Sequence, residues 1–272
     1  MTVRWCAGAG ATAPGDRPKN EDAFLSSGPV HVVADGMGGH LAGAAASSAV
    51  VEAFRELTDA ATVDPDDVVL AVARAQEAVE RLSERVGGSS GSTLTGAIAV
   101  EHDGQPWWMV INVGDSRVYT IEGGVLSQIT VDHSYVQRLV ERGDITPAQA
   151  EVHPDRNIVT RAIGDGIRDF DAWLVQARPG SRLVVASDGL MKALSDARIA
   201  SIASLAGEVS LAAGRLVGAA VDAAASDNVT VVVVDTLHAH TDPDADPSPW
   251  RLWGARGDDD DTTISGRRRE SV

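Results

Sequence analysis

The chain has a single cysteine and lacks any apolar run long enough to cross a bilayer. The first shortage excludes an internal disulfide, and the second argues against a membrane-spanning helix. Cys6 has no partner for an internal disulfide, which fits a reducing compartment. A membrane-spanning helix needs about 20 mostly apolar residues, so we expect no membrane association. Residues 1–6 show no basic segment leading into an apolar stretch. We therefore expect no secretory signal and a cytoplasmic protein.

Positive charge is scarce as well, and the chain carries a net charge of −16 at pH 7. This charge argues against a nucleic acid as partner, because phosphates would be repelled. No cysteine pair or close histidine pair offers a zinc site. No G-x-x-x-x-G-K-[ST] string is present, so the glycine-rich turn at residues 36–39 is weak support for the alternative of a nucleotide-binding enzyme.

The composition changes near residue 238. Hydrophobic residues make up 44% of the 272-residue chain, enough for one sizeable core. Residues 238–272 contain three prolines and four consecutive aspartates, with too little apolar surface to offset the entropy of ordering. We therefore expect one folded domain over residues 1–237 and a disordered tail over 238–272. Trp250 and Trp253 are the exception, with docking on the folded body left open.

Short β-branched runs predict strands, and longer apolar periodicities predict helices. The strands are expected over residues 31–34, 94–100, 107–113, 117–121, 183–186 and 229–234. The helices are expected over residues 42–57, 66–86 and 210–225, the second with Val69, Val72, Ala73, Gln76 and Val79 near one face. Consecutive strands with few crossovers favour antiparallel pairing. We therefore expect an α+β fold in which two packed, mainly antiparallel β-sheets form a β-sandwich flanked by helices on both outer faces.

Acidic residues stand at the ends of predicted strands, often beside a glycine. They are Asp35 before Gly36, Asp115 after Gly114, Asp188 before Gly189, Asp227 before the last strand, and Glu21–Asp22 near the start. One Asp-Gly pair is an ordinary turn. Several carboxylates in one place repel each other and lose hydration, which divalent cations relieve. Ligation by oxygen alone favours Mg²⁺ or Mn²⁺.

Five motifs follow one another along the chain. They are RPKNED at 17–22, DGMGGH at 35–40, GDSR at 114–117, SDG at 187–189 and DN at 227–228. Their order resembles that of bacterial metal-dependent protein serine/threonine phosphatases of the type 2C class. The resemblance covers residues 8–236. Residues 130–146, together with 153–157 and 160–164, are similar to the mobile flap of that family.

The resemblance implies two cations per active site, Mn²⁺ or Mg²⁺, and leaves a third open. Asp35 would bridge the two central cations, and the Gly36 carbonyl would join the second. The other implied ligands are Glu21 at the second cation, Asp188 and Asp227 at the first, and Asp115 with Asp188 at the third. Asp22 and Asn228 would not bind the cations themselves but would hold these ligands in position.

The resemblance also implies the reaction. Phosphoserine and phosphothreonine in proteins would be hydrolysed by direct attack of a water or hydroxide bridging the metals. Arg17 would grip the substrate phosphate, while a salt bridge that steadies the amino-terminal strand is the alternative for it. Phosphorylated proteins, including serine/threonine kinases that such an enzyme opposes in signalling, are the implied partners. We expect a monomer.

Three departures and two further alternatives accompany the resemblance. Met37 stands where eukaryotic relatives have a histidine general acid, and for His40 and His133 a turn or packing role is favoured over that task. Ala44 replaces part of a common Gly-Glu pair, and the loop before Arg17 is one residue short. The alternatives are a catalytically inactive phosphoprotein-binding module and a phosphatase that acts on one small regulator domain.

Overall fold

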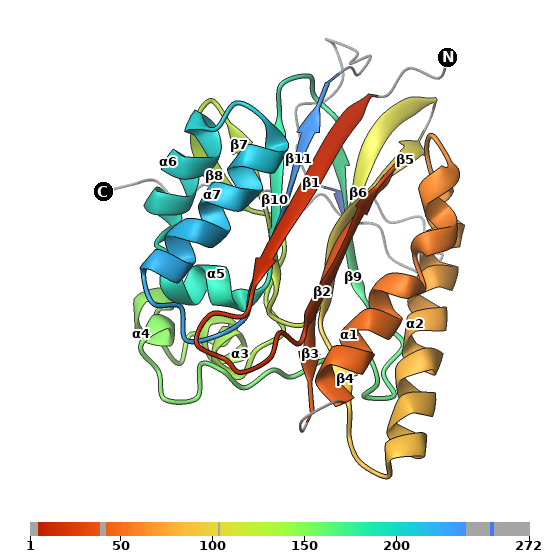
Figure 1. Cartoon of the computed structure of the whole chain (residues 1–272), viewed down its shortest axis with the longest axis vertical. Coiled ribbons are helices and arrows are strands. Elements are labelled where there is room, and N and C mark those ends of the chain that lie inside the picture. Colours follow the sequence, from red (N-terminus) through yellow and green to blue (C-terminus); the bar gives the residue numbers. More distant parts are fainter. Residues whose placement is uncertain (1–4, 39–41, 103, 238–250, 253–272) are drawn as a thin grey trace.

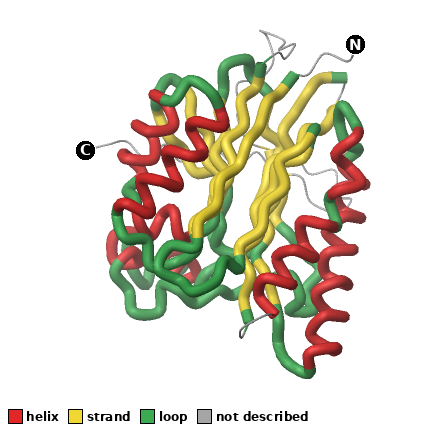
Figure 2. Tube along the Cα trace, in the orientation of Figure 1, coloured by secondary structure: helices red, strands yellow, loops and turns green. Residues whose placement is uncertain are grey.

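The computed structural model describes residues 5–38, 42–102 and 104–237, and the backbone of residues 251–252. Two β-sheets pack face to face, and helices cover their outer faces (Figure 1 and Figure 2). The predicted α+β sandwich is confirmed. Trp250, Trp253 and most of the predicted tail lie outside the described residues.

Each pair of neighbouring strands in the two sheets is antiparallel. The first sheet has the order β1 (Cys6–Ala13), β11 (Val229–Thr236), β10 (Arg182–Ala186), β7 (Arg117–Glu122), β8 (Val125–Gln128). The second has the order β12 (Arg251–Leu252), β9 (Asp171–Gln176), β6 (Gln105–Val113), β5 (Leu94–His102), β3 (Val30–Met37), β2 (Asp22–Ser27), with β4 (Gly91–Ser92) paired to β3. The short strand β12 lies within the predicted tail, and the sequence pattern does not predict its pairing with β9.

The helices form two outer layers and one connecting segment, and Figure 1 labels them. The second sheet is covered by α1 (Ala42–Glu52) and α2 (Pro65–Val86), joined by the 3₁₀ turn η1 (Arg55–Asp59). The first sheet is covered by α5 (Asp188–Ala193), α6 (Asp196–Leu205) and α7 (Val209–Asp222). The segment between β8 and β9 carries α3 (Tyr135–Glu141) and α4 (Pro147–Glu151). None of the helices in the described ranges combines the length and apolarity needed to cross a bilayer.

The strand β3 explains how the core fixes one end of the site. Successive side chains of a strand point to opposite faces, so Val32 packs under α1 and α2 while Val33 packs between the sheets. Both side chains are fully buried, and burial of each contributes roughly 1.5–3 kcal/mol. A strand held on both faces in this way cannot slip in register without exposing apolar surface. The residues at its end, Asp35 and Gly36, are therefore held in place.

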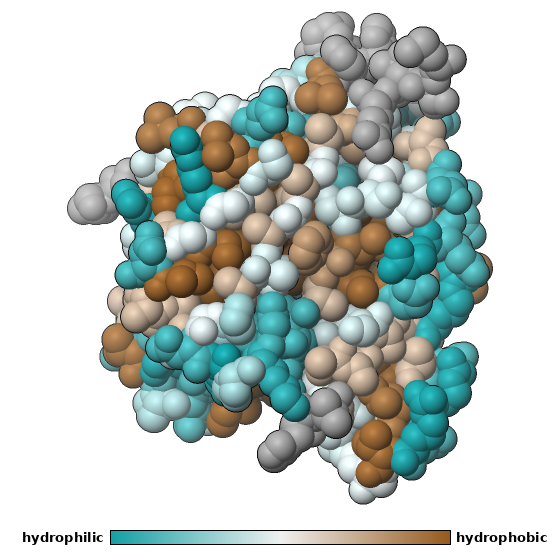
Figure 3. All heavy atoms as spheres, in the orientation of Figure 1, coloured by the Kyte–Doolittle hydropathy of each residue, from teal (hydrophilic) through white to brown (hydrophobic). Residues whose placement is uncertain are grey.

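Helix α2 is close to its predicted bounds, although its buried face is turned slightly. Asp64 caps its start, with Oδ1 accepting a hydrogen bond from the N–H of Asp66 at 2.9 Å. Val69 and Ala73, predicted on the buried face, are partly exposed. The buried residues are Val68, Ala71, Val72, Ala75, Gln76 and Val79. On the face in Figure 3, hydrophilic side chains follow the outer side of this helix.

Two predicted helices end earlier than expected. Helix α1 ends at Glu52, because Phe54 turns into the core and its N–H bonds the Val51 carbonyl three residues back at 3.2 Å. Helix α7 ends at Asp222, and Ala224 then takes the left-handed backbone conformation with φ of 57°. This turn lets the chain reverse into β11, which positions Asp227.

Candidate metal centre

The first half of the candidate site lies where β2 begins and β3 ends. Asp22 and Asp35 are direct partners in the antiparallel register of these strands. The N–H of Gly36 donates to the carbonyl oxygen of Glu21 at 3.1 Å. Thr93 Oγ1 accepts from the N–H of Asp35 at 2.9 Å. Strand pairing therefore brings four of the predicted site residues to one end of the second sheet.

The second half comes from the other sheet, at the end of β10 and the start of β11. Asp188 is the first residue of α5 and lies two residues after β10, and Asp227 stands two residues before β11. The hydroxyl of Ser187 donates to Asp22 Oδ2 at 2.7 Å. This bond joins the two halves, because Ser187 adjoins Asp188 and Asp22 lies opposite Asp35.

Asn228 connects the second half to the amino-terminal loop. Its Oδ1 accepts from the N–H of Glu21 at 2.8 Å. Its Nδ2 donates to the carbonyl oxygens of Pro14 at 3.0 Å and Lys19 at 2.9 Å. Asn228 thus holds both ends of the loop that carries Arg17.

Asp115 reaches the same region from β6. It follows that strand in a buried turn, and the hydroxyl of the next residue, Ser116, shares a hydrogen bond of 2.8 Å with Thr93 Oγ1. The same Thr93 oxygen accepts from Asp35, so the two turns are tied together. Burial, followed by the negative charge of Asp188, raises the pKa of Asp115 to about 7.

The carboxylates of this region crowd one another. Burial, above all, raises the pKa of Asp35 well above its usual value, and nearby negative charges add to it. These charges belong to Asp22, Asp188, Asp115 and Asp227. Burial also raises the pKa of Asp22 to about 6, with Asp188 and Asp227 contributing. Several ionised carboxylates buried this close together destabilise the folded protein unless positive charge lies among them.

The donor atoms of these residues have the chemistry of a divalent-cation centre. Asp22 Oδ1 and Asp188 Oδ1 are buried and have no hydrogen-bond partner. Such acceptors cost about 1–3 kcal/mol each when they stay unpaired. A Cβ on Gly36 would lie 2.1 Å from the carbonyl oxygen of Gly43, so only glycine fits there. The Glu21 carboxylate lies close to Gly43, and every predicted donor is an oxygen, which suits Mg²⁺ or Mn²⁺.

One residue of the centre was missed by the sequence analysis. Lys192 Nζ lies 2.5 Å from Asp188 Oδ2 and 2.9 Å from Asp227 Oδ2. In the part of the chain that the structure describes, no three Asp, Glu, His or Cys side chains are grouped as they would be around one ion. The ammonium of Lys192 lies between two of the predicted ligands. The available signal was the spacing, since residues four apart on a helix are neighbours.

Arg17 lies at the rim of the centre. Its Nε is 3.1 Å from Asp227 Oδ1 and donates to the carbonyl oxygen of Ser226 at 3.1 Å, while its side chain is 56% exposed. Burial raises the pKa of Asp227, but the hydrogen bond and charge of Lys192 and the charge of Arg17 lower it below its usual value. The short loop therefore still brings Arg17 to the site, where its ion-pair partner is Asp227.

His133 connects the flap-like segment, residues 130–146, to the centre by hydrogen bonds. Its Nδ1 accepts from the N–H of Gly114 at 3.1 Å, and its Nε2 lies 3.1 Å from Asp171 Oδ2. Since Nδ1 accepts, the ring proton is on Nε2 and points to Asp171. Arg161 Nη1 bonds the other oxygen of Asp171 at 3.0 Å. Both ring nitrogens of His133 are engaged, which favours the predicted packing role over that of a general acid.

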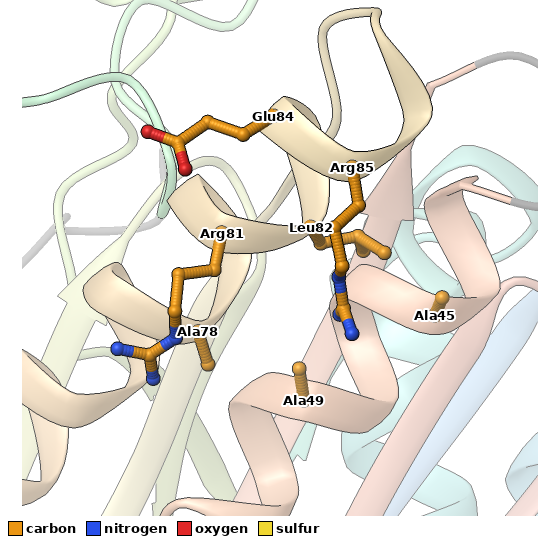
Figure 4. A pocket seen from close by; sticks show the side chains of 7 residues that line it. All are labelled: Ala45, Ala49, Ala78, Arg81, Leu82, Glu84 and Arg85. Carbon is orange, nitrogen blue, oxygen red and sulfur yellow. The ribbon is translucent and has the colours of Figure 1, made fainter.

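A separate groove lies between α1 and α2, and Figure 4 shows its side chains. Its lining consists of Ala45, Ala49, Ala78, Arg81, Leu82, Glu84 and Arg85. None of the predicted site residues lines this groove. Of the other candidates from the sequence, His40 lies outside the described residues.

The fold and the converging carboxylates together define a class of protein. The family model "Protein phosphatase 2C" matches residues 19–229. The chain therefore belongs to the protein phosphatase 2C family.

Individual relatives agree with this assignment. The serine/threonine protein phosphatase PstP of Mycobacterium tuberculosis is 36% identical over 254 residues, which cover 91% of this chain and 48% of PstP. The chain thus spans about half the length of that relative. The serine/threonine phosphatase stp of Listeria innocua is 33% identical over 76% of this chain and 84% of its own. A crystal structure of the PstP catalytic domain in complex with two manganese ions matches with a TM-score of 0.78 and 32% identity, over 86% of this chain and 99% of that one.

Proposed function

We propose that the chain is a metal-dependent protein phosphatase that hydrolyses phosphoserine and phosphothreonine in proteins. The observation that carries the proposal is the meeting of strand-end carboxylates from both sheets, two of them with buried oxygens that lack a partner. Membership of the protein phosphatase 2C family supports it. So do the relatives, which are named serine/threonine phosphatases.

We assign the metal-binding roles to the carboxylates as the sequence motifs predict. Asp35 would hold both central cations, Asp188 and Asp227 the first, and Glu21 with the Gly36 carbonyl the second. Asp115 is available, with Asp188, for a third. The manganese ions in the PstP structure support Mn²⁺, and oxygen ligation admits Mg²⁺ equally. When bound, the pair supplies Lewis acidity that lowers the pKa of water and offsets charge on phosphoryl oxygens.

The remaining residues position the substrate and the ligands. Arg17 offers a planar, permanently charged guanidinium to the phosphate from the rim of the centre. Asp22 and Asn228 hold the ligands through their contacts with Ser187 and Glu21. The side chain of Met37 has no proton to give, so we assign protonation of the leaving serine oxygen to solvent within the site.

The biological setting follows from the same proposal. Phosphorylated proteins, including bacterial serine/threonine kinases, are the proposed partners of a monomer that acts in cytoplasmic signalling. The net charge of −16 supports the absence of nucleic acid among the partners. Residues 1–237 form the proposed catalytic domain, and residues 238–272 the proposed tail, which pairs with β9 only through Arg251–Leu252 among the described residues.

Phosphate release from synthetic phosphopeptides tests the proposal. Metal-stripped protein is expected to release no phosphate from phosphothreonine or phosphoserine peptides, to regain activity with Mn²⁺, and to act poorly on phosphotyrosine. Asp35→Asn should abolish release, while Asp222→Asn, an exposed aspartate of α7, should not. Undiminished activity in EDTA, with no metal in the protein, would refute the proposal. Tight peptide binding without release would favour the inactive binding module.

A further inference from the structure

Lys192 places a positive charge inside the group of predicted metal ligands. Its Nζ bonds Asp188 on its own helix and Asp227 on the segment before β11, at 2.5 and 2.9 Å. The second contact sets it apart from an ordinary helical ion pair, because Asp227 belongs to another element. Asp188 and Asp227 are both largely buried, with side chains 16% and 22% exposed.

The two oxygens of each carboxylate are used differently. Asp188 Oδ2 contacts the ammonium, whereas its Oδ1 is buried and has no partner. Asp227 Oδ2 contacts the same ammonium, and its Oδ1 contacts Arg17. The protein's own cations therefore neutralise part of this side of the centre, while Asp22 Oδ1 and Asp188 Oδ1 stay without a donor.

The presence of a lysine rather than an arginine at position 192 also bears on the role of this residue. The chain has only two lysines, and its other 21 basic residues are arginines. An ammonium is a compact point charge on a flexible stem, whereas a guanidinium is a rigid planar fork. Of the two, the ammonium is nearer in shape and charge density to a metal ion, and its stem can swing away. The side chain of Lys192 is 30% exposed, so solvent is open to it on one side.

We propose that Lys192 is a tethered cation of the metal centre, which holds the Asp188–Asp227 pair when divalent ions are scarce and must be displaced before Mn²⁺ or Mg²⁺ binds both carboxylates. The inference rests on the proposed metal centre. The proposal implies that Lys192 has opposite effects on the stability of the metal-free protein and on its affinity for metal. Lysine stabilises the metal-free protein and weakens its affinity for the first cation, so activity responds to the concentration of divalent metal.

Calorimetric titration of Mn²⁺ into EDTA-stripped, full-length protein tests the inference, alongside thermal melts with and without Mn²⁺. Lys192→Met removes the charge and keeps a linear side chain, and Lys192→Gln is the second neutral variant if the first does not fold. Lys192→Arg keeps the charge. Arg81→Met is the matched control, because it removes one positive charge from α2, where Arg81 pairs with Glu77. Arg81 lines the separate groove between α1 and α2 (Figure 4).

The neutral variants should bind the first Mn²⁺ at least about tenfold more tightly than the wild type, because one like charge is removed from its ligands. Their metal-free melting temperature should fall, and the rise on adding Mn²⁺ should grow. Lys192→Arg and Arg81→Met should bind no more tightly than the wild type.

Unchanged or weaker Mn²⁺ binding by folded Lys192→Met or Lys192→Gln overturns the inference. If the wild type still binds Mn²⁺ and hydrolyses phosphopeptide in that case, the proposed function stands. If the wild type binds no Mn²⁺ at all, both the function and the inference are rejected.

Discussion

Asp22 offers the clearest link between the charge of this centre and the stability of the protein. Burial raises its pKa from 3.8 to about 6, with Asp188 and Asp227 adding to the shift against hydrogen bonds from Thr230 and Ser187. A carboxyl whose pKa is raised by folding stabilises the fold fully below its unfolded pKa. That contribution is lost as the pH rises through the folded pKa. The metal-free protein should therefore lose stability between about pH 4 and pH 6, the interval between the unfolded and folded pKa values of Asp22.

The size of the effect follows from the shift. One pKa unit corresponds to about 1.4 kcal/mol, so a shift from 3.8 to about 6 corresponds to roughly 3 kcal/mol. Asp22→Asn removes the charge without changing the volume, and the amide oxygen can still accept the Ser187 hydrogen bond. At pH 8 in EDTA the variant should melt higher by about 6–12 °C, since each kcal/mol moves the midpoint by about 2–4 °C in a protein of this size.

Differential scanning fluorimetry at pH 5 and pH 8, in EDTA and in Mn²⁺, measures this directly. The gain should shrink at pH 5, where Asp22 is already neutral in the fold, and in Mn²⁺, which offsets the charge of the centre. Asp222→Asn, an exposed aspartate, is the control and should change little under each condition. A gain of equal size at both pH values, or a loss at pH 8 in EDTA, would show that Asp22 carries no buried charge.

Three further predictions follow from the same contacts. Asp188→Asn should abolish Mn²⁺-dependent hydrolysis of p-nitrophenyl phosphate while the protein stays folded by circular dichroism; near-wild-type rates would remove it from the ligands. Arg17→Ala should raise KM strongly with a smaller fall in kcat, by roughly ten- to a hundredfold in kcat/KM for one charge-assisted contact of about 1.5–3 kcal/mol. A lower melting temperature with unchanged KM would mean that its ion pair with Asp227 is purely structural. Removal of residues 238–272 should leave the rate on p-nitrophenyl phosphate nearly unchanged, because β12 pairs with β9 at the edge of the sheet opposite β2; loss of activity would give the tail a part in catalysis.

Much of the fold was predictable because its strands have a recognisable sequence pattern, a short run of β-branched residues. The β-branched runs at 31–34 and 229–234 are buried on both faces, and each lies inside an observed strand. The end of such a run can also be located in the sequence, which is why Asp35 and Asp227 could be expected at strand termini. Helix ends were harder, since Phe54 stops α1 through a tertiary contact that periodicity does not contain.

The candidate site was predicted less completely. The motifs name the residues that meet, including Asp22, whose contact with Ser187 ties the sheets together. Lys192 could not be found this way, because a lysine four residues after Asp188 on a short helix suggests an ordinary surface pair. Only the packing of α5 beside the start of β11 brings Asp227 to the same ammonium. The bond of His133 to Asp171 likewise joins residues far apart in the sequence.

The central claim is that the strand-end carboxylates hold the catalytic cations. Diffraction from Mn²⁺-soaked crystals, collected at the manganese absorption edge, locates the ions directly. The account predicts anomalous peaks bonded to Asp35, Asp188 and Asp227, with a second ion toward Glu21 and the Gly36 carbonyl, and with Lys192 moved away from its two partners. Peaks elsewhere on the protein, or none at these carboxylates in a Mn²⁺-active preparation, would contradict it.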